Sequence, residues 1–273
     1  MMLTPAIVLT VCLPLADFAT NSVAERIARS DPSLGLSRFL DYPHCFPEHP
    51  SLNPKFWLRR VDFSCVSPWN DGSGAIRAGT AISKRHIVCA AHLPVWKGMR
   101  MLFVGEDGGT CPCYVEATRT LPKTDIMIAS LNAELTPNIH PAKLLPPDYE
   151  KHIGDGRGLP VVTFNQHEEV FYTELDSLTF FANYPYTRSR LPEDSSRAAF
   201  RKPIVGGDSG DPAFLLIGDE PILLYCLKHG GCGAGPGLHL WRNEIQNAMD
   251  ELCPGYRLEV ADLKSMCKNR GVP

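Results

Sequence analysis

The sequence predicts an all-β fold made of many short strands joined by turns. Its 273 residues include 24 prolines and 22 glycines, which end strands and form turns. Between them lie short apolar runs with β-branched residues, such as Ile87 to Ala91 and Pro160 to Phe164, and such runs are typical of buried strands. Hydrophobic residues make up 44% of the chain, which is enough for a substantial core in one large domain or two small ones.

The first residues raise the question of export. Leu3 to Ala16 is largely apolar but too short for a membrane span, and Ser22-Val23-Ala24 resembles a small-residue cleavage site. The basic segment that normally opens a signal peptide is missing. We predict a signal peptide over residues 1–24 and a secreted or periplasmic protein. The alternative is an apolar leader that stays attached.

The rest of the chain divides by its periodicity. Residues 25–60, with helix-like pieces followed by several prolines, predict an N-terminal extension or a propeptide. Strand patterns then fill about 61–145 and resume over 159–240. A final amphipathic helix is predicted over 243–252 and is expected to pack against the second strand-rich half, before a tail at 253–273. Its apolar face contains Ile245, Ala248, Met249 and Leu252.

The stretch from Val205 to Pro212 reads VGGDSGDP and places a serine among turn-forming residues. Glycine tolerates positive φ and close approach of a ligand, so the backbone amides of Gly207 and Ser209 are candidates for an oxyanion hole beside the Ser209 hydroxyl. The alternative is an ordinary surface turn, since the same residues dominate turns for steric reasons.

Two upstream residues are candidate partners of this serine. His92 ends the apolar run from Ile87, just before Pro94, and a histidine at a strand end has a fixed position and an open face. Asp125 heads the apolar run to Leu131, where an acid could accept a proton from a histidine ring and fix its tautomer. Taken singly, a structural histidine and a solvated aspartate are the simpler explanations.

Together, these residues occur in the order His92, Asp125, Ser209, which is the order of the chymotrypsin arrangement. The segments GTAISKRHIVCAAH, DIMIASL and GGDSGDPAF resemble the histidine, aspartate and serine motifs of chymotrypsin/trypsin-like serine proteases, and LLYCLKHGGCGAGPGLHLW resembles their substrate-pairing strand. The resemblance implies a trypsin-like domain over 61–252. It also implies two six-stranded antiparallel Greek-key β-barrels, at about 61–145 and 159–240, with the C-terminal helix.

The resemblance further implies a serine endopeptidase that works through an acyl-enzyme intermediate and needs no cofactor or metal. Ser209 would be the nucleophile, His92 the general base and then acid, and Asp125 the residue that orients His92. A catalytically silent module of the same fold, which binds peptides or serves structurally, is the alternative. An esterase is disfavoured because GDSG is not the G-x-S-x-G elbow of α/β-hydrolases and the triad order differs.

The expected partner is a peptide or protein substrate whose identity the sequence does not define. Trypsin-type enzymes carry an acid six residues before the nucleophile, and here that residue is Pro203, which argues against a preference for Arg or Lys. His229 lies near the substrate-pairing strand and could favour an acidic or polar side chain. Lys202, one position before Pro203, could have the same effect, and the alternative is that Lys202 and His229 are ordinary exposed loop residues.

Ten cysteines are many for a reduced cytosolic protein, so we expect disulfides, although their connectivity cannot be derived. Zinc is the less favoured explanation, because Cys111-Pro112-Cys113 is spaced more tightly than common structural sites, with His44, Cys45 and His49 as the other candidate ligands. The net charge of −3, with no basic cluster longer than Arg59-Arg60, gives no sign of nucleic-acid binding.

Overall fold

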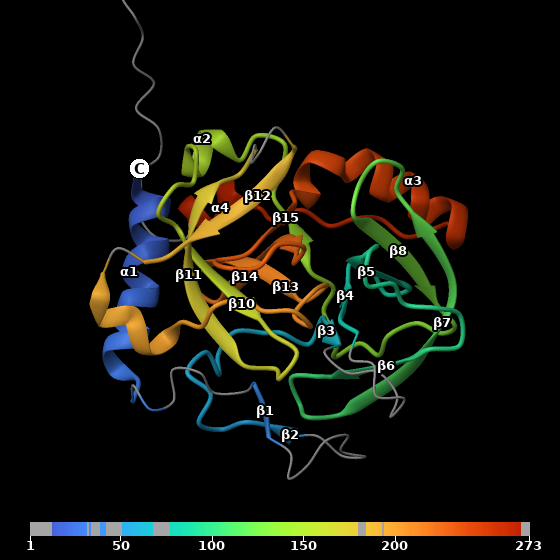
Figure 1. Ribbon diagram of the computed structural model, residues 1–273, viewed down its shortest axis with the longest axis horizontal. Helices are drawn as coiled ribbons and strands as arrows, with labels where there is room; N and C mark the ends of the chain where they lie inside the picture. The colour runs from blue at the N-terminus through green and yellow to red at the C-terminus, as the bar shows by residue number, and fades with distance from the viewer. Residues whose placement is uncertain are drawn as a thin grey trace, which may run out of the picture.

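The computed structural model describes residues 13–31, 33, 39–41, 51–67, 77–179, 184–192 and 194–268. Cys12, His44, Cys45 and His49 lie outside these ranges. The described chain is mostly β, with one sheet of six strands and one of seven lying side by side (Figure 1). The predicted β-rich class is therefore confirmed.

The six-stranded sheet is antiparallel throughout and nearly closes into a barrel. Its order is β3 (Val66–Ser67), β4 (Gly79–Ala81), β5 (His86–Ala90), β8 (Ile126–Leu131), β7 (Thr110–Thr120) and β6 (Arg100–Val104). The end strands approach each other, since the Leu102 amide of β6 donates a 3.0 Å hydrogen bond to the Ser67 hydroxyl of β3. This closure protects both edges of the sheet from other chains.

The seven-stranded sheet contains the second half of the chain. Its order is β15 (Ala234–Pro236), β12 (Tyr186–Arg190), β11 (Val170–Ser177), β10 (Pro160–Phe164), β13 (Pro212–Ile217), β14 (Glu220–Cys226) and β9 (Lys143–Leu144). All pairings are antiparallel except that of β9, which runs parallel to β14. The seventh strand thus comes from the end of the segment expected to belong to the first half.

Aromatic side chains join the two sheets into one core. The ring of Phe63, just before β3, lies 5.0 Å from Phe164 of β10 and 5.6 Å from Phe214 of β13, measured between centroids. The first contact is edge-to-face, a favoured geometry for aromatic pairs. All three residues are buried, so the sheets are held at a fixed relative position.

Two helices cover the sheets. Helix α1 (Leu13–Arg29) packs beside the seven-stranded sheet, with Leu15 and Ala19 buried against it (Figure 1). The predicted signal peptide would end inside this helix, and its removal stays a prediction. None of the helices in the described residues is both long and apolar enough to span a membrane.

Helix α3 (Arg242–Leu252) confirms the predicted apolar face, because Ile245, Ala248 and Met249 are buried. The prediction that this face packs against the second strand-rich half was wrong. The helix packs on β7 and β8 of the six-stranded sheet, and an ion pair of 3.1 Å joins Arg119 to Glu251. The 3-10 turn η3 (Leu238–Trp241) leads from β15 directly into this helix. The remaining short elements are β1 (Leu40–Asp41), β2 (Ser51–Leu52), α2 (Glu150–Ile153), η2 (Ser195–Phe200) and α4 (Leu263–Lys268).

The cysteines in the described chain are free thiols, so the expected disulfides are not found there. Cys111 and Cys113 lie near each other, since they point to one face of β7 with sulfur atoms 3.9 Å apart. A disulfide requires about 2.05 Å. Cys89, in β5, is fully buried, as its apolar surroundings predict. The described cysteines are Cys65, Cys89, Cys111, Cys113, Cys226, Cys232, Cys253 and Cys267.

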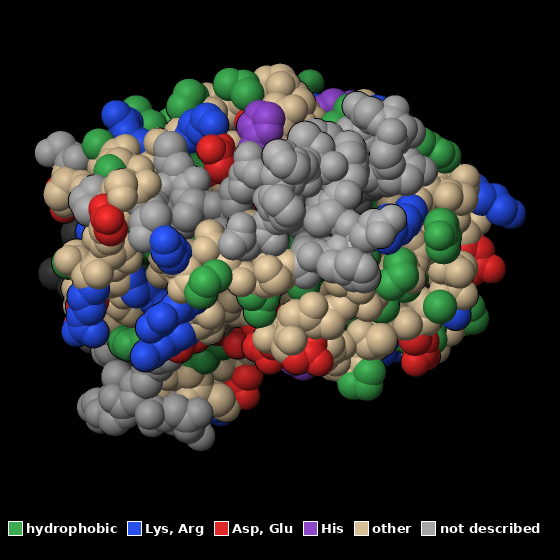
Figure 2. Space-filling model, turned by 90° about the horizontal axis from the view of Figure 1, so that it is seen from below, with side chains coloured by type: hydrophobic (Ala, Val, Ile, Leu, Met, Phe, Trp, Pro, Cys, Tyr) green, Lys and Arg blue, Asp and Glu red, His purple; other side chains and the backbone are tan. Residues whose placement is uncertain are grey.

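Charges of both signs lie on the surface. On the face seen in Figure 2, Asp and Glu side chains gather near the lower middle, and most Lys and Arg side chains lie to their left. The net charge of −3, the difference between 27 basic and 30 acidic residues, does not reveal this local separation.

Candidate active site

The pairing of β5 with β8 brings His92 and Asp125 together. In this antiparallel pair Ala90 lies opposite Ile126, so the residues just beyond these strand ends are also neighbours. The Ala91 amide continues the pairing by donating to the Asp125 carbonyl at 3.0 Å. His92 and Asp125 are distant in sequence, but they meet because His92 follows β5 and Asp125 precedes β8, the strand paired with β5.

Asp125 holds His92 through two hydrogen bonds. Its carboxylate accepts the His92 backbone amide at 2.9 Å and is 2.6 Å from the ring Nδ1. The Asp125 side chain is 6% exposed and the His92 side chain 40% exposed. A proton on Nδ1 that is held by the carboxylate leaves Nε2 as the basic nitrogen on the open side of the ring.

The serine loop packs against the same strand. A Cβ atom added to Gly210 would lie 3.7 Å from the backbone nitrogen of Ala90 and 3.8 Å from its Cβ, which are ordinary van der Waals distances and place the loop directly against the strand. The Gly210 amide also donates to the Leu227 carbonyl at 2.9 Å. Ser209, which is partly buried, therefore lies at the end of β5 that leads to His92, although the described residues show no hydrogen bond between the two side chains.

The backbone around the serine is shaped by two glycines with positive φ, Gly207 at 105° and Gly210 at 90°. Such angles are strained for residues with a Cβ, so glycine is required at both positions. Within the described chain, the amides of Gly207 and Ser209 donate no hydrogen bond. Two free donors beside a serine hydroxyl are what stabilisation of an oxyanion needs.

Asp208 stabilises this loop together with Gln166, a residue that the sequence did not indicate. The buried Asp208 carboxylate accepts the Val205 amide at 2.8 Å and both the backbone and side-chain nitrogens of Gln166, at 3.3 and 3.2 Å. The Gln166 side chain also donates to the Gly206 carbonyl at 3.1 Å. Gln166 lies in the turn between β10 and β11, where nothing in its sequence context marks it.

Asp211 lies inside the protein beneath the serine loop. It is 1% exposed, and its Oδ1 atom has no hydrogen-bond partner in the described structure. Burial raises the pKa of this carboxyl well above its ordinary value, and the negative groups of Asp208 and Glu168 raise it further. A neutral acid at this position adds no charge next to the serine.

A small cavity of about 150 Å³ opens beside Ser209. His229 lines it, whereas Pro203 is exposed and is not among the lining residues. Desolvation and the adjacent Lys228 lower the pKa of His229, which favours its neutral form. No acid is among the lining residues in the described chain: Ile204, Val205, Gly206, Ser209, Leu227, Lys228, His229 and Gly230.

Larger cavities lie elsewhere. One of about 740 Å³ is bordered by α1 and the Pro54–Trp57 segment, and one of about 660 Å³ lies beside Phe39 and Phe63. Size alone would favour them as binding sites. The small cavity is the better candidate because Ser209 lines it, and the Ser209 loop packs against the end of β5 that leads to the His92–Asp125 pair.

The chain has no match among models of protein families, and no curated protein matches it. The site is therefore interpreted from its own residues.

Proposed function

We propose that the protein is a serine endopeptidase of the chymotrypsin type, whose two sheets are Greek-key barrels with the site between them. The observation that carries the proposal is the His92–Asp125 pair at the end of β5, against which the Ser209 loop packs. An imidazole held in one tautomer beside a serine is the arrangement that nucleophilic acyl transfer requires.

The mechanism follows from these positions. The Ser209 oxygen attacks the scissile carbonyl carbon while His92 Nε2 accepts the serine proton. The Gly207 and Ser209 amides stabilise the resulting oxyanion. His92 then protonates the leaving amine, which departs and leaves an acyl-enzyme. Water, deprotonated by His92, attacks the carbonyl carbon of that ester. As the bond to Ser209 breaks, His92 returns the proton to the serine oxygen, which releases the carboxylic acid product and restores the Ser209 hydroxyl.

The cavity beside Ser209 suggests which side chain precedes the cleaved bond. A volume of about 150 Å³ without a lining acid suits a small or medium uncharged side chain better than Arg or Lys. The neutral form favoured for His229 offers a hydrogen bond and no charge. Lys228 is held by the Tyr186 hydroxyl at 2.7 Å, which limits its reach into the cavity.

A fluorophosphonate probe tests the proposal, because it labels only an activated serine. We expect the wild-type protein to be labelled and Ser209→Ala to be inert, with Ser33→Ala, a change at an exposed serine, labelled as the wild type is. If the wild-type protein resists the probe as fully as Ser209→Ala, the chain is a silent module of this fold. Cleavage of a peptide library would then define the substrate of an active protein.

A further inference from the structure

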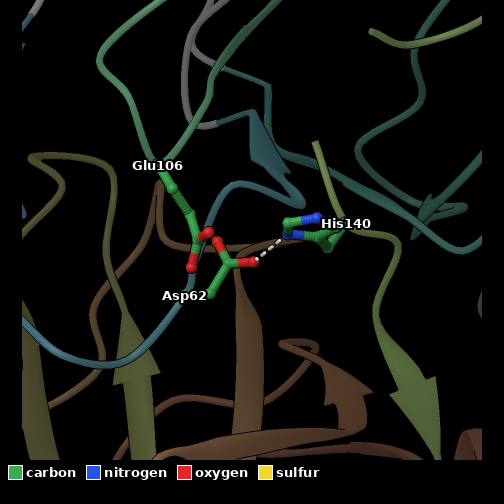
Figure 3. Close-up of side chains that lie close together, drawn as sticks. All are labelled: Asp62, Glu106 and His140. Atoms are coloured by element: carbon green, nitrogen blue, oxygen red, sulfur yellow. Dashed lines mark hydrogen bonds and ion pairs between the residues drawn. The ribbon is translucent and has the colours of Figure 1, made fainter. Parts of the chain in front are cut away.

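A second group of reactive side chains lies apart from the serine loop. Asp62 precedes β3, Glu106 follows β6 in the hairpin to β7, and His140 precedes β9. One ligand atom from each lies within 4.8 Å of the others, and Figure 3 shows the three side chains converging. Asp62 and Glu106 also line the cavity of about 660 Å³, and none of the three borders the cavity beside Ser209.

The backbone holds these side chains in place. Ser64 links two of the segments, because its amide donates to the Asp62 carboxylate at 2.8 Å and its hydroxyl accepts the His140 amide at 2.9 Å. The hairpin that carries Glu106 is joined to the His140 segment by a 2.6 Å hydrogen bond from Asn138 to Asp107. The group is therefore organised before any ligand arrives.

The charges in this group are incompletely balanced. The Asp62 carboxylate lies 2.7 Å from Nδ1 of His140, but in the described chain Glu106 forms no ion pair or hydrogen bond. Arg59 and Arg60 border the same cavity, yet within the described residues neither of them pairs with an acid. Two carboxylates this close together repel each other unless a cation lies between them.

We propose that Asp62, Glu106 and His140 bind one divalent transition-metal ion of the manganese or zinc type. An imidazole nitrogen with two carboxylate oxygens suits such ions, whereas Ca²⁺ and Mg²⁺ prefer oxygen ligands alone. With ligand bonds of about 2.1 Å, neighbouring ligand atoms lie roughly 3 Å apart. The Asp62 carboxylate oxygen and His140 Nδ1 are 2.7 Å apart, so these two atoms need to separate by only a few tenths of an ångström to reach that distance.

The bound ion would act as a clamp between the six-stranded sheet and a segment that leads to the seven-stranded sheet. It would join the segment leading into β3, the hairpin between β6 and β7 and the segment leading into β9. Water would complete its coordination from the open cavity, since the Glu106 and His140 side chains are exposed. The protein should therefore become more stable as the ion is added, by mass action.

Manganese(II) is the best probe, because the ten cysteines of the chain would compete for zinc. The full chain, dialysed against a chelator, is titrated with Mn²⁺ while free Mn²⁺ is measured by electron paramagnetic resonance and the melting temperature is recorded. We expect one tight site and a rise in melting temperature. Glu106→Gln and His140→Asn should each weaken binding at least tenfold and abolish the rise.

The matched control is His152→Asn. His152 lies 3.6 Å from Asp148 in a histidine–carboxylate pair that has no third ligand among the described residues, and this variant should bind Mn²⁺ as the wild type does. The proposal is overturned if the wild-type protein binds no Mn²⁺, or if Glu106→Gln and His140→Asn bind it with unchanged affinity. Because activity is not the readout, these results stand apart from those of the fluorophosphonate test.

Discussion

Among single residues, Asp125 has the clearest role in the proposed reaction. It is nearly buried and holds both the backbone and the ring of His92. Asp125→Asn keeps the size of the side chain but presents an amide to Nδ1, which favours the wrong tautomer of His92. We expect turnover of a peptide substrate to fall by roughly 10⁴, as in related triads.

Steady-state kinetics of Asp125→Asn measure this loss, with circular dichroism to confirm that the variant is folded. Asp155→Asn, at an exposed aspartate of the second half, is the matched control and should keep full activity. Activity of Asp125→Asn within tenfold of the wild type would remove Asp125 from the mechanism.

Asp211 makes a separate prediction about stability. Its pKa in the folded protein is raised, because burial and two nearby acids disfavour its charged form. Below about pH 4, the ordinary pKa of an aspartate, the Asp211 carboxyl is protonated in both the folded and the unfolded protein and does not lower the free energy of unfolding. As the pH rises, the carboxyl loses its proton first in the unfolded chain. The free energy of unfolding therefore falls by up to about 1.4 kcal/mol per pH unit, until the pH exceeds the pKa of Asp211 in the folded protein.

Asp211→Asn should therefore be more stable than the wild type, by a margin that is small near pH 4 and grows toward neutral pH. Urea unfolding of both proteins between pH 4 and 8 measures this margin. Asp17→Asn, at an exposed aspartate of α1, should show none of this growth. A margin that shrinks as the pH rises would contradict the assignment of a neutral Asp211.

Among the elements, the hairpin between β10 and β11 supports the serine loop through Gln166. Its side chain bonds Asp208 and Gly206, and a Cβ atom on Gly207 would lie within 2.5 Å of its amide atoms. Gln166→Ala should loosen the proposed oxyanion site. We expect kcat to fall by about 10-fold to 10²-fold with little change in KM, which is less than the roughly 10²–10³ lost with a donor itself.

Gln246→Ala is the control for this effect, because Gln246 also bonds backbone groups, at Tyr256 and Leu258, but lies on α3. It should leave kcat unchanged. Equal losses in kcat for the two variants would mean that Gln166 acts only through general stability.

The strand that His92 follows and the strand that Asp125 precedes were predictable, because short apolar β-branched runs mark both of them. Gln166 was not, because an isolated glutamine in a turn has no local signal and acquires its partners only when two distant loops meet. The partner sheet of α3 was missed for a similar reason. An amphipathic face predicts that the helix packs, but the surface it covers depends on the path through η3.

On the scale of the whole molecule, the two sheets share one hydrophobic core. Phe63, from the segment before β3, contacts Phe164 and Phe214 of the other sheet. The proposed site would depend on this shared core, since His92 and Asp125 adjoin strands of one sheet and the serine loop leads into a strand of the other. The sequence predicted the two strand-rich halves but not this contact, because burial identifies core residues without identifying their partners.

Phe63→Ala tests this dependence. Removing the ring leaves a cavity between the sheets and should lower the free energy of unfolding by about 3–5 kcal/mol. Because both sheets lose contacts, far-UV circular dichroism and tryptophan fluorescence should report one transition at a lower urea concentration. Tyr114→Ala, at an exposed aromatic residue of β7, should shift stability by no more than about 0.5 kcal/mol. Two separate transitions in Phe63→Ala would show instead that the sheets unfold independently.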